Sequence, residues 1–312
     1  MTIAVMTSPV AAPAKPAGLS ATTKGMLFGM IAVLIWGGYL AMARRSIGGG
    51  WTAMDLAMFR YVTAGVIMLP WLLRHGLGTM GGVGWGRGLV LAALAGPGFI
   101  LAAVGGYAFA PLAHGAVIQP AAVVLGGAAL AAFVLGDRPG PARLAGIALM
   151  VVGLCLVAGP GLLAGTAQTP IGDTLFVLAG LMWAGFGTLS RLWGVGAIAG
   201  TAAVSVISGA VMLPAYLLFV GPERLLAASP GELVIQIVVQ GVLAGVVAVI
   251  AYSRAVQLLG AGAAAVFPAL VPAAAIAVGV PLVGEIPAAH ALAGLAMVTF
   301  GLLVALGVLR RR

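Results

Sequence analysis

The sequence predicts an all-α membrane protein whose ten spanning helices form two inverted halves of five. The first reason is composition, because 62% of the 312 residues are hydrophobic and only 7% are charged, which is too little charge to cover a soluble domain. The second reason is a series of ten apolar runs that are each long enough to cross a bilayer. The third reason is that the chain repeats itself at about half its length.

The first half of the chain holds five apolar runs of about 20 residues each, the length that a spanning helix needs. They cover residues 25–43, 53–73, 86–108, 112–135 and 141–159. Their apolar residues are continuous rather than alternating, so the runs are helices, which satisfy their own backbone hydrogen bonds in lipid. The turn "GDRPGP" between the last two runs is short, so these helices are expected to be neighbours.

The second half of the chain holds five similar runs, at residues 172–192, 198–220, 232–254, 262–283 and 288–309. We therefore expect a first repeat over residues 24–160 and a second repeat over residues 171–309. Residues 1–23 are rich in Ala, Pro and Thr. A cleaved signal peptide is conceivable there, but the segment lacks a basic start and a proper apolar core, and a disordered cytoplasmic tail is the favoured interpretation.

The distribution of Lys and Arg predicts the orientation, because short cytoplasmic loops are enriched in these residues. With the N-terminus inside, eleven fall inside and three fall outside, while Arg60 lies within the second helix. The inside segments hold Lys15, Lys24, Arg74, Arg87, Arg138, Arg143, Arg191, Arg254, Arg310, Arg311 and Arg312. The outside loops hold Arg44, Arg45 and Arg224. Both termini are therefore predicted to be cytoplasmic.

The repeat is visible in the stretches "LIWGGYLAMAR" and "LMWAGFGTLSR", in which Trp36 corresponds to Trp183, 147 residues later. The turn "GDRP" corresponds to "GEIP", and Pro120 corresponds to Pro268, both at an offset of 148. Five is an odd number of helices, so equivalent helices of the two halves must run in opposite directions. Such inverted repeats are the architecture that many secondary transporters use for alternating access.

These motifs resemble the EamA repeat, which defines a branch of the drug/metabolite transporter superfamily. The resemblance covers nearly all of residues 25–309, and it extends less closely to the bacterial aromatic amino-acid exporters. It implies two inverted five-helix EamA repeats around a central cavity, lined mainly by the first, third, fourth, sixth, eighth and ninth helices. It also implies a protein that exports small metabolites across the inner membrane.

Aromatic pairs are the first candidates for substrate contact. Trp36 and Tyr39 are three residues apart and share a helix face, as do Trp183 and Phe186. A symmetric pair suits a cavity on the symmetry axis, whereas an aromatic belt at the membrane interface or simple packing is the alternative.

Polar residues in the run 232–254 are the second candidates, because polar side chains in a membrane usually face the interior of the bundle. Gln236, Gln240 and Arg254 share one helix face. We expect Gln240 to face the cavity or to make an interhelical hydrogen bond, and Arg254 either to join it or to reach solvent. Tyr252 is expected to lie away from this face.

The third and fourth runs contribute Tyr107, His114 and Gln119, with a structural role as the alternative for His114. Pro120 and Pro268 each free a backbone carbonyl four residues earlier, so they are candidate hinges or simple kinks. Phe267 is a candidate apolar wall.

The sequence excludes several other classes of function. It has no phosphate-binding Gly-Lys-Ser/Thr loop, no cluster of metal ligands and no catalytic constellation, and its single cysteine, Cys155, allows no disulfide within one chain. All six acidic residues are expected near span ends or in turns, so no carboxylate is expected at mid-membrane. Scattered basic residues give no nucleic-acid surface.

The leading interpretation is therefore a cofactor-free secondary transporter that exports amino acids or similar metabolites. The expected partners are a small-molecule substrate and the lipid bilayer, and the expected assembly is a monomer or a weak homodimer. One alternative is an exchanger of sugar nucleotides or phosphorylated metabolites, which would need several basic residues in the cavity, where Arg254 and Arg60 are the only candidates. The other is a membrane-embedded enzyme or scaffold.

Overall fold

The structure is a computed structural model that describes residues 19–110, 112–271, 273–275, 277–278 and 288–306. These residues form helices and turns, and no strand occurs among them. Within this described part of the chain, eight helices are long and apolar enough to cross a membrane, and two shorter apolar helices follow, at Ala261–Ala275 and Ala289–Ala305. The prediction of an all-α membrane protein is confirmed.

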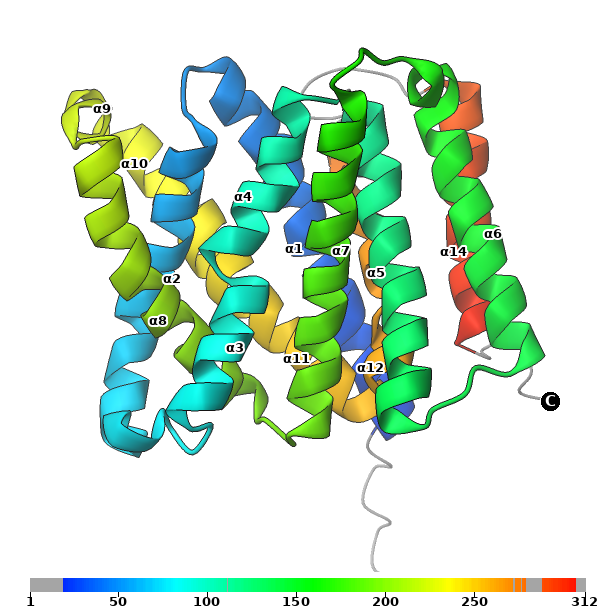
Figure 1. Ribbon diagram of the computed structural model, residues 1–312, viewed down its shortest axis with the longest axis horizontal. Coiled ribbons are helices and arrows are strands. Elements are labelled where there is room, and N and C mark those ends of the chain that lie inside the picture. Colours follow the sequence, from blue (N-terminus) through cyan, green and yellow to red (C-terminus); the bar gives the residue numbers. More distant parts are fainter. Residues whose placement is uncertain (1–18, 111, 272, 276, 279–287, 307–312) are drawn as a thin grey trace, which may run out of the picture.

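The helices lie side by side in one bundle (Figure 1). The first half comprises α1 (Ala21–Gly48), α2 (Ala53–His75), η1 (Leu77–Thr79), α3 (Trp85–Ala95), α4 (Pro97–Gly105), η2 (Gly106–Ala108), α5 (Leu112–Leu135), α6 (Pro141–Ala158) and η3 (Gly159–Leu163). The second half comprises α7 (Thr169–Leu192), α8 (Ala197–Phe219), α9 (Glu223–Ala227), α10 (Pro230–Gln236), η4 (Ile237–Val247), α11 (Ala248–Leu259), α12 (Ala261–Ala264), η5 (Phe267–Leu270) and α14 (Ala289–Ala305).

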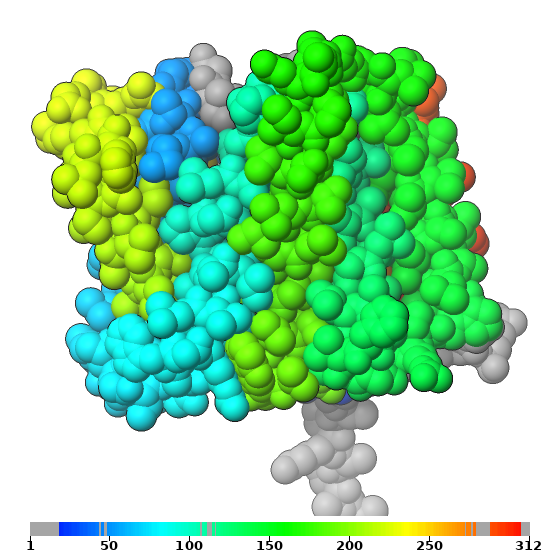
Figure 2. Space-filling model, in the orientation of Figure 1, coloured from blue at the N-terminus to red at the C-terminus, as the bar shows by residue number. Residues whose placement is uncertain are grey.

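The helix α1 begins and the helix α14 ends at the same end of the bundle, which is the lower end in Figure 1. We call this end, which also holds the turn between α5 and α6, the inner end. The opposite end, which holds the connections from α1 to α2 and from α8 to α9, is called the outer end. The space-filling view shows that the helices form one continuous body between these ends (Figure 2).

The two halves are inverted, and equivalent helices of the two halves pack against each other. The second helices of the halves, α2 and α8, are in contact, as are the fifth helices, α6 and α14. A Cβ atom on Gly153 would lie 2.8 Å from the carbonyl oxygen of Gly294, and a Cβ atom on Gly294 would lie 2.5 Å from that of Gly153. Gly146 and Gly301 approach each other in the same reciprocal way, at 2.5 and 2.7 Å. These helices therefore cross backbone to backbone, which only glycine permits.

The third span is divided in the middle, although the sequence predicts one continuous helix over residues 86–108. α3 ends and α4 begins on either side of Gly96, because Pro97 has no N–H to continue the helix. The hydroxyl of Tyr61 on α2 donates to the carbonyl oxygens of Ala95 and Gly96, at 3.0 and 2.8 Å. The break is thus satisfied by a neighbouring helix, as membrane-embedded backbone requires.

The eighth span also departs from a regular helix. Between α10 and α11 it contains η4, a π-helix of 11 residues. A π-helix is rare and is frequently found at functional sites. The third and eighth spans are equivalent, because each is the third helix of its half. Both halves therefore contain an irregular helix at the equivalent position.

Candidate functional site

Five aromatic side chains meet at the centre of the bundle, and we call them the aromatic cluster. Trp36 comes from α1, Phe99 from α4, Trp183 and Phe186 from α7, and Tyr252 from α11. The rings of Trp36 and Trp183 meet edge to face, with centroids 5.1 Å apart and an angle of 83° between the planes. The ring of Trp183 also lies 5.1 Å from Phe99, 5.2 Å from Phe186 and 5.4 Å from Tyr252. Such separations are typical of attractive aromatic pairs.

The cluster joins the two halves of the molecule. Trp36 and Trp183 occupy equivalent positions in the repeats, and all five side chains are buried. They come from the first, third, sixth and eighth helices in chain order. In this structure the rings pack together where the resemblance implied a central cavity, so a solute in the centre would have to part them. The indole nitrogen of Trp36 is buried without a hydrogen-bond partner among the described residues, which leaves a donor available there.

Tyr252 belongs to this cluster although it was expected to lie away from the Gln240 face. That expectation assumed a regular α-helix through residues 232–254. Bonding from residue i to i+5 takes up more residues per turn than α-helical bonding, so the 11 residues of η4 shift the register of α11 by about two residues, or roughly half a turn. The π-helix therefore brings Tyr252 to the centre.

Gln240 lies in η4 and is fully buried. Its amide nitrogen donates to Oε1 of Gln236 at 3.2 Å, and Nε2 of Gln236 donates to the hydroxyl of Ser46 on α1 at 2.7 Å. The side-chain oxygen Oε1 of Gln240 has no partner among the described residues. The interhelical hydrogen bond is thus made by Gln236, and Gln240 keeps an acceptor unused.

Tyr39 lies one helical turn from Trp36 on α1, toward the outer end, and faces Arg60 of α2. The guanidinium carbon of Arg60 is 5.5 Å from the centre of the Tyr39 ring and 5.9 Å from that of Tyr61. Arg60 is buried, with 4% of its surface exposed. Arg60 was considered from the sequence only as a possible cation for a phosphorylated solute, and the signal that points to it is a lone charge within an apolar span.

His114 lies apart from the aromatic cluster. Its Nδ1 is 2.9 Å from Oδ1 of Asp173 on α7, and its Nε2 is 2.8 Å from the carbonyl oxygen of Ala164. Both ring nitrogens are therefore engaged in a link between α5, α7 and the connection that follows η3. This arrangement matches the structural role considered for His114.

Arg254 is also away from the cluster, because its side chain is exposed near the inner end of α11. It donates to Oε1 of Gln257 at 3.2 Å. A small hollow lies beside it, lined by Ser190, Ser253 and Gln257 among others. Arg254 thus reaches solvent at the inner end.

The remaining predicted residues lie along the fourth and ninth helices. Gln119 is half-buried on α5, and Pro120 lies inside that continuous helix. Phe267 and Pro268 lie in the short 3₁₀ helix η5, and the ring of Phe267 packs where a Cβ on Gly29 would clash, at 2.4 Å. Gly29 precedes Trp36 by two turns of α1, so Phe267 is nearer the inner end than the cluster. The side chain of Tyr107 lies outside the described residues.

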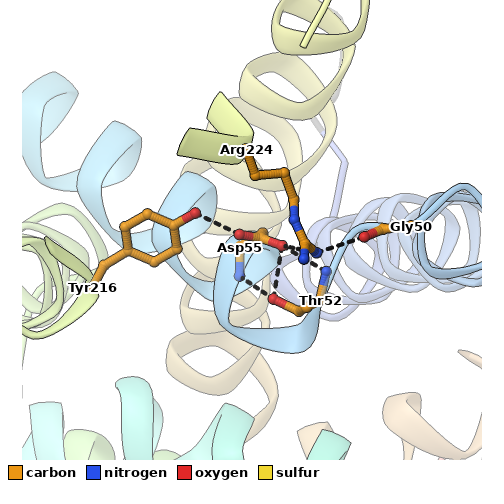
Figure 3. A network of polar contacts seen from close by, with 5 residues as sticks. All are labelled: Gly50, Thr52, Asp55, Tyr216 and Arg224. Atoms are coloured by element: carbon orange, nitrogen blue, oxygen red, sulfur yellow. Dashed lines mark hydrogen bonds and ion pairs between the residues drawn. The ribbon is translucent and has the colours of Figure 1, made fainter. Parts of the chain in front are cut away.

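The outer end holds a polar network that links the two halves (Figure 3). Asp55, at the start of α2, is completely buried. Its carboxylate accepts hydrogen bonds from the hydroxyl of Tyr216 on α8 at 2.5 Å and from Nη1 of Arg224 on α9 at 3.0 Å. Thr52 donates to the same carboxylate from its backbone and its hydroxyl, at 2.6 and 2.7 Å, and Arg224 also donates to the carbonyl oxygen of Gly50 at 2.5 Å.

Asp55 lies near the end of a span, as the sequence predicts. It is also a buried residue of a contact between the repeats. Its position in a helix of the first half gave no hint of Tyr216 and Arg224, which lie more than 160 residues away in the chain.

Comparisons with known proteins agree with the two-repeat architecture. The model of the EamA-like transporter family matches the chain twice, at residues 23–159 and 170–307. A solved structure described only as a crystal structure of a protein matches with a TM-score of 0.73 and 22% sequence identity, over 94% of this chain and 99% of the other. At this identity the likeness shows the fold alone. No curated protein matches the chain.

Proposed function

Because the chain belongs to the EamA-like transporter family, we propose that it is a secondary transporter that exports amino acids with aromatic or other apolar side chains. Membership and the apolar helices make it a multi-pass membrane transporter of small molecules. The narrower proposal adds the class of solute, the direction of transport and the bacterial inner membrane, with both termini in the cytoplasm.

The observation that carries the proposal is the aromatic cluster. Transporters with inverted repeats bind their substrates near the bilayer midplane, at the interface between the repeats. Here that interface presents five aromatic rings, including the symmetry-related Trp36 and Trp183. Apolar walls with a few placed polar groups are typical of small-molecule sites. The unpaired nitrogen of Trp36 and the unpaired oxygen of Gln240 supply such groups, and the latter suits an amino group of the solute.

Alternating access follows from the same arrangement. The network around Asp55 holds the halves together at the outer end, so a solute that parts the aromatic cluster leaves to the outside only when these contacts open. The irregular spans, α3–α4 and α10–η4–α11, are equivalent in the two halves. Each supplies one ring of the cluster, Phe99 and Tyr252 respectively. We propose that they are the elements that move.

The alternative, an exchanger of phosphorylated metabolites, fits less well. It would need several cations facing the centre to neutralise a phosphate. Among the described arginines and lysines, Arg60 is the one that is buried. One buried cation matches a single carboxylate better than a sugar phosphate.

The test is efflux of labelled phenylalanine from proteoliposomes, with melting temperature measured on the same samples. We expect Trp36→Ala, Trp183→Ala and Gln240→Ala each to reduce flux per folded molecule. Each aromatic ring contributes roughly 0.5–1.5 kcal/mol to an aromatic solute, which corresponds to a loss of about 2- to 12-fold in apparent affinity.

The matched control is Trp85→Ala, which removes an exposed tryptophan from the inner end of α3 and is expected to leave flux unchanged. If the rings only pack, the cluster variants will melt at lower temperature while their flux per folded molecule stays normal. That result would remove the central site from the proposal and leave the family assignment standing.

A further inference from the structure

Arg60 is a buried cation that has no carboxylate partner among the described residues. It lies within α2, seven residues after the start of that helix, and its side chain is 4% exposed. Guanidinium groups stay charged at any pH that a protein tolerates. The cost of burying the charge of Arg60 must therefore be offset by its contacts or by a ligand.

No described carboxylate pairs with Arg60. The five described acidic residues lie elsewhere. Three of them have ion-pair partners, which are Arg224 for Asp55, Arg143 for Asp137 and His114 for Asp173. Glu232 caps α10, and Glu223 is exposed on α9. The guanidinium of Arg60 lies over the ring faces of Tyr39 and Tyr61. Two tyrosine rings offset only part of the cost of burying a charge, and intramembrane charges usually serve function.

The position of Arg60 connects it with the candidate site. Tyr39 lies one turn from Trp36 on the same face of α1, so Arg60 lies next to the outer side of the aromatic cluster. On its other side α2 packs against η4, where a Cβ on Gly245 would lie 3.1 Å from the carbonyl oxygen of Arg60. η4 also carries Gln240 with its unpaired oxygen. A cation and an acceptor thus come from two adjoining helices beside apolar rings.

We infer that Arg60 binds the carboxylate of the transported solute. The planar guanidinium matches a carboxylate with two parallel hydrogen bonds, and Tyr39 and Tyr61 hold it in place. The inference rests on the proposed function and narrows it: the solutes carry a free carboxylate, and the aromatic cluster takes the apolar side chain. Neutral amides and amines of the same size are poor substrates.

The experiment compares phenylalanine with phenylalaninamide, which differs only at the carboxyl group, as competitors of labelled phenylalanine flux in proteoliposomes. We expect the native protein to prefer the acid by about 10- to 100-fold, the range of a hydrogen bond to a charged group. Arg60→Gln and Arg60→Met are expected to lose this preference, and Arg60→Lys to keep part of it. The matched control is Arg87→Gln, which removes an exposed arginine that lies 5.7 Å over the ring of Trp193 and should keep the preference.

Melting temperature separates this role from a structural one. Removing an unpaired buried charge should leave the unliganded protein as stable as before or more stable, whereas loss of a structural arginine would lower its melting temperature. Equal competition by acid and amide in the native protein, or an unchanged preference in Arg60→Gln, would overturn the inference.

A native protein that moves neither phenylalanine nor its amide would instead count against the proposed function. Arg60 is then tested by thermal shift with pairs of acids and their amides that carry apolar, polar and acidic side chains. Stabilisation by an acid and not by its amide, lost in Arg60→Gln, supports the inference. No difference between the members of any pair overturns it.

Discussion

A single side chain, Asp55, ties the two repeats together at the outer end. Its buried carboxylate accepts from Thr52 within the first half and from Tyr216 and Arg224 of the second half. The contact with Thr52 is local to the start of α2, whereas the other two must break if the halves are to separate. The network therefore stabilises the closed outer end specifically.

Asp55→Asn and Tyr216→Phe are expected to shift the molecule toward states that are open at the outer end. A hydrogen bond to a charged group contributes about 1.5–3 kcal/mol, so the population of open molecules should rise by roughly 10-fold or more. The readout is labelling of Ala43→Cys, a buried position late in α1, by an impermeant maleimide in a Cys155→Ser background. Asp137→Asn is the control, because its partner Arg143 lies at the inner end. Equal labelling of all three variants would contradict the role of the network.

The sequence identified about half of the candidate site. Trp36, Trp183 and Phe186 were found because they repeat at a fixed offset and are aromatic, and both properties are visible without coordinates. Phe99 and Tyr252 were missed or set aside because their positions depend on the broken third helix and on the π-helix. Arg60 was considered only for the alternative solute, because the sequence does not reveal which acidic residues already have partners.

At the scale of helices, the contact between α6 and α14 depends on glycines. We expect Gly153→Ala and Gly294→Ala to lower stability by about 1–3 kcal/mol, since each new methyl group would overlap the opposite backbone. Melting in detergent measures the effect. Gly140→Ala is the control, because a Cβ there meets nothing within 4 Å, and unchanged melting of all three variants would show that the helices pack less closely.

The positions of the helices were predictable from the sequence, but their hydrogen bonding was not. The boundaries of α5, α6 and α8 fall within one residue of the predicted runs, since hydropathy and turn residues mark where a span begins and ends. The division at Gly96, the π-bonding of η4 and the short segments α12 and η5 are invisible to hydropathy. The tripeptide Gly96-Pro97-Gly98 is the one local signal that would have predicted a break.

At the scale of the whole molecule, the orientation in the membrane is a prediction from charge. Reporter fusions after Arg312 and after Gly221 are expected to lie in the cytoplasm and the periplasm respectively, because they follow the last helix and α8. Eleven basic residues on one side against three on the other favour this arrangement. Reporters on the same side for both fusions would be incompatible with the inverted repeat.

The packing of equivalent helices against each other has a consequence for the orientation of the chain in the membrane. The contacts of Gly146 with Gly301 and of Gly153 with Gly294 join equivalent surfaces of the two inverted repeats. Such a contact is unchanged when the molecule is inserted in the opposite orientation. Two copies of one ancestral half, inserted in opposite directions, would make this contact without any covalent link. This contact therefore does not distinguish the inside from the outside, and we expect the basic residues of the loops to set the orientation.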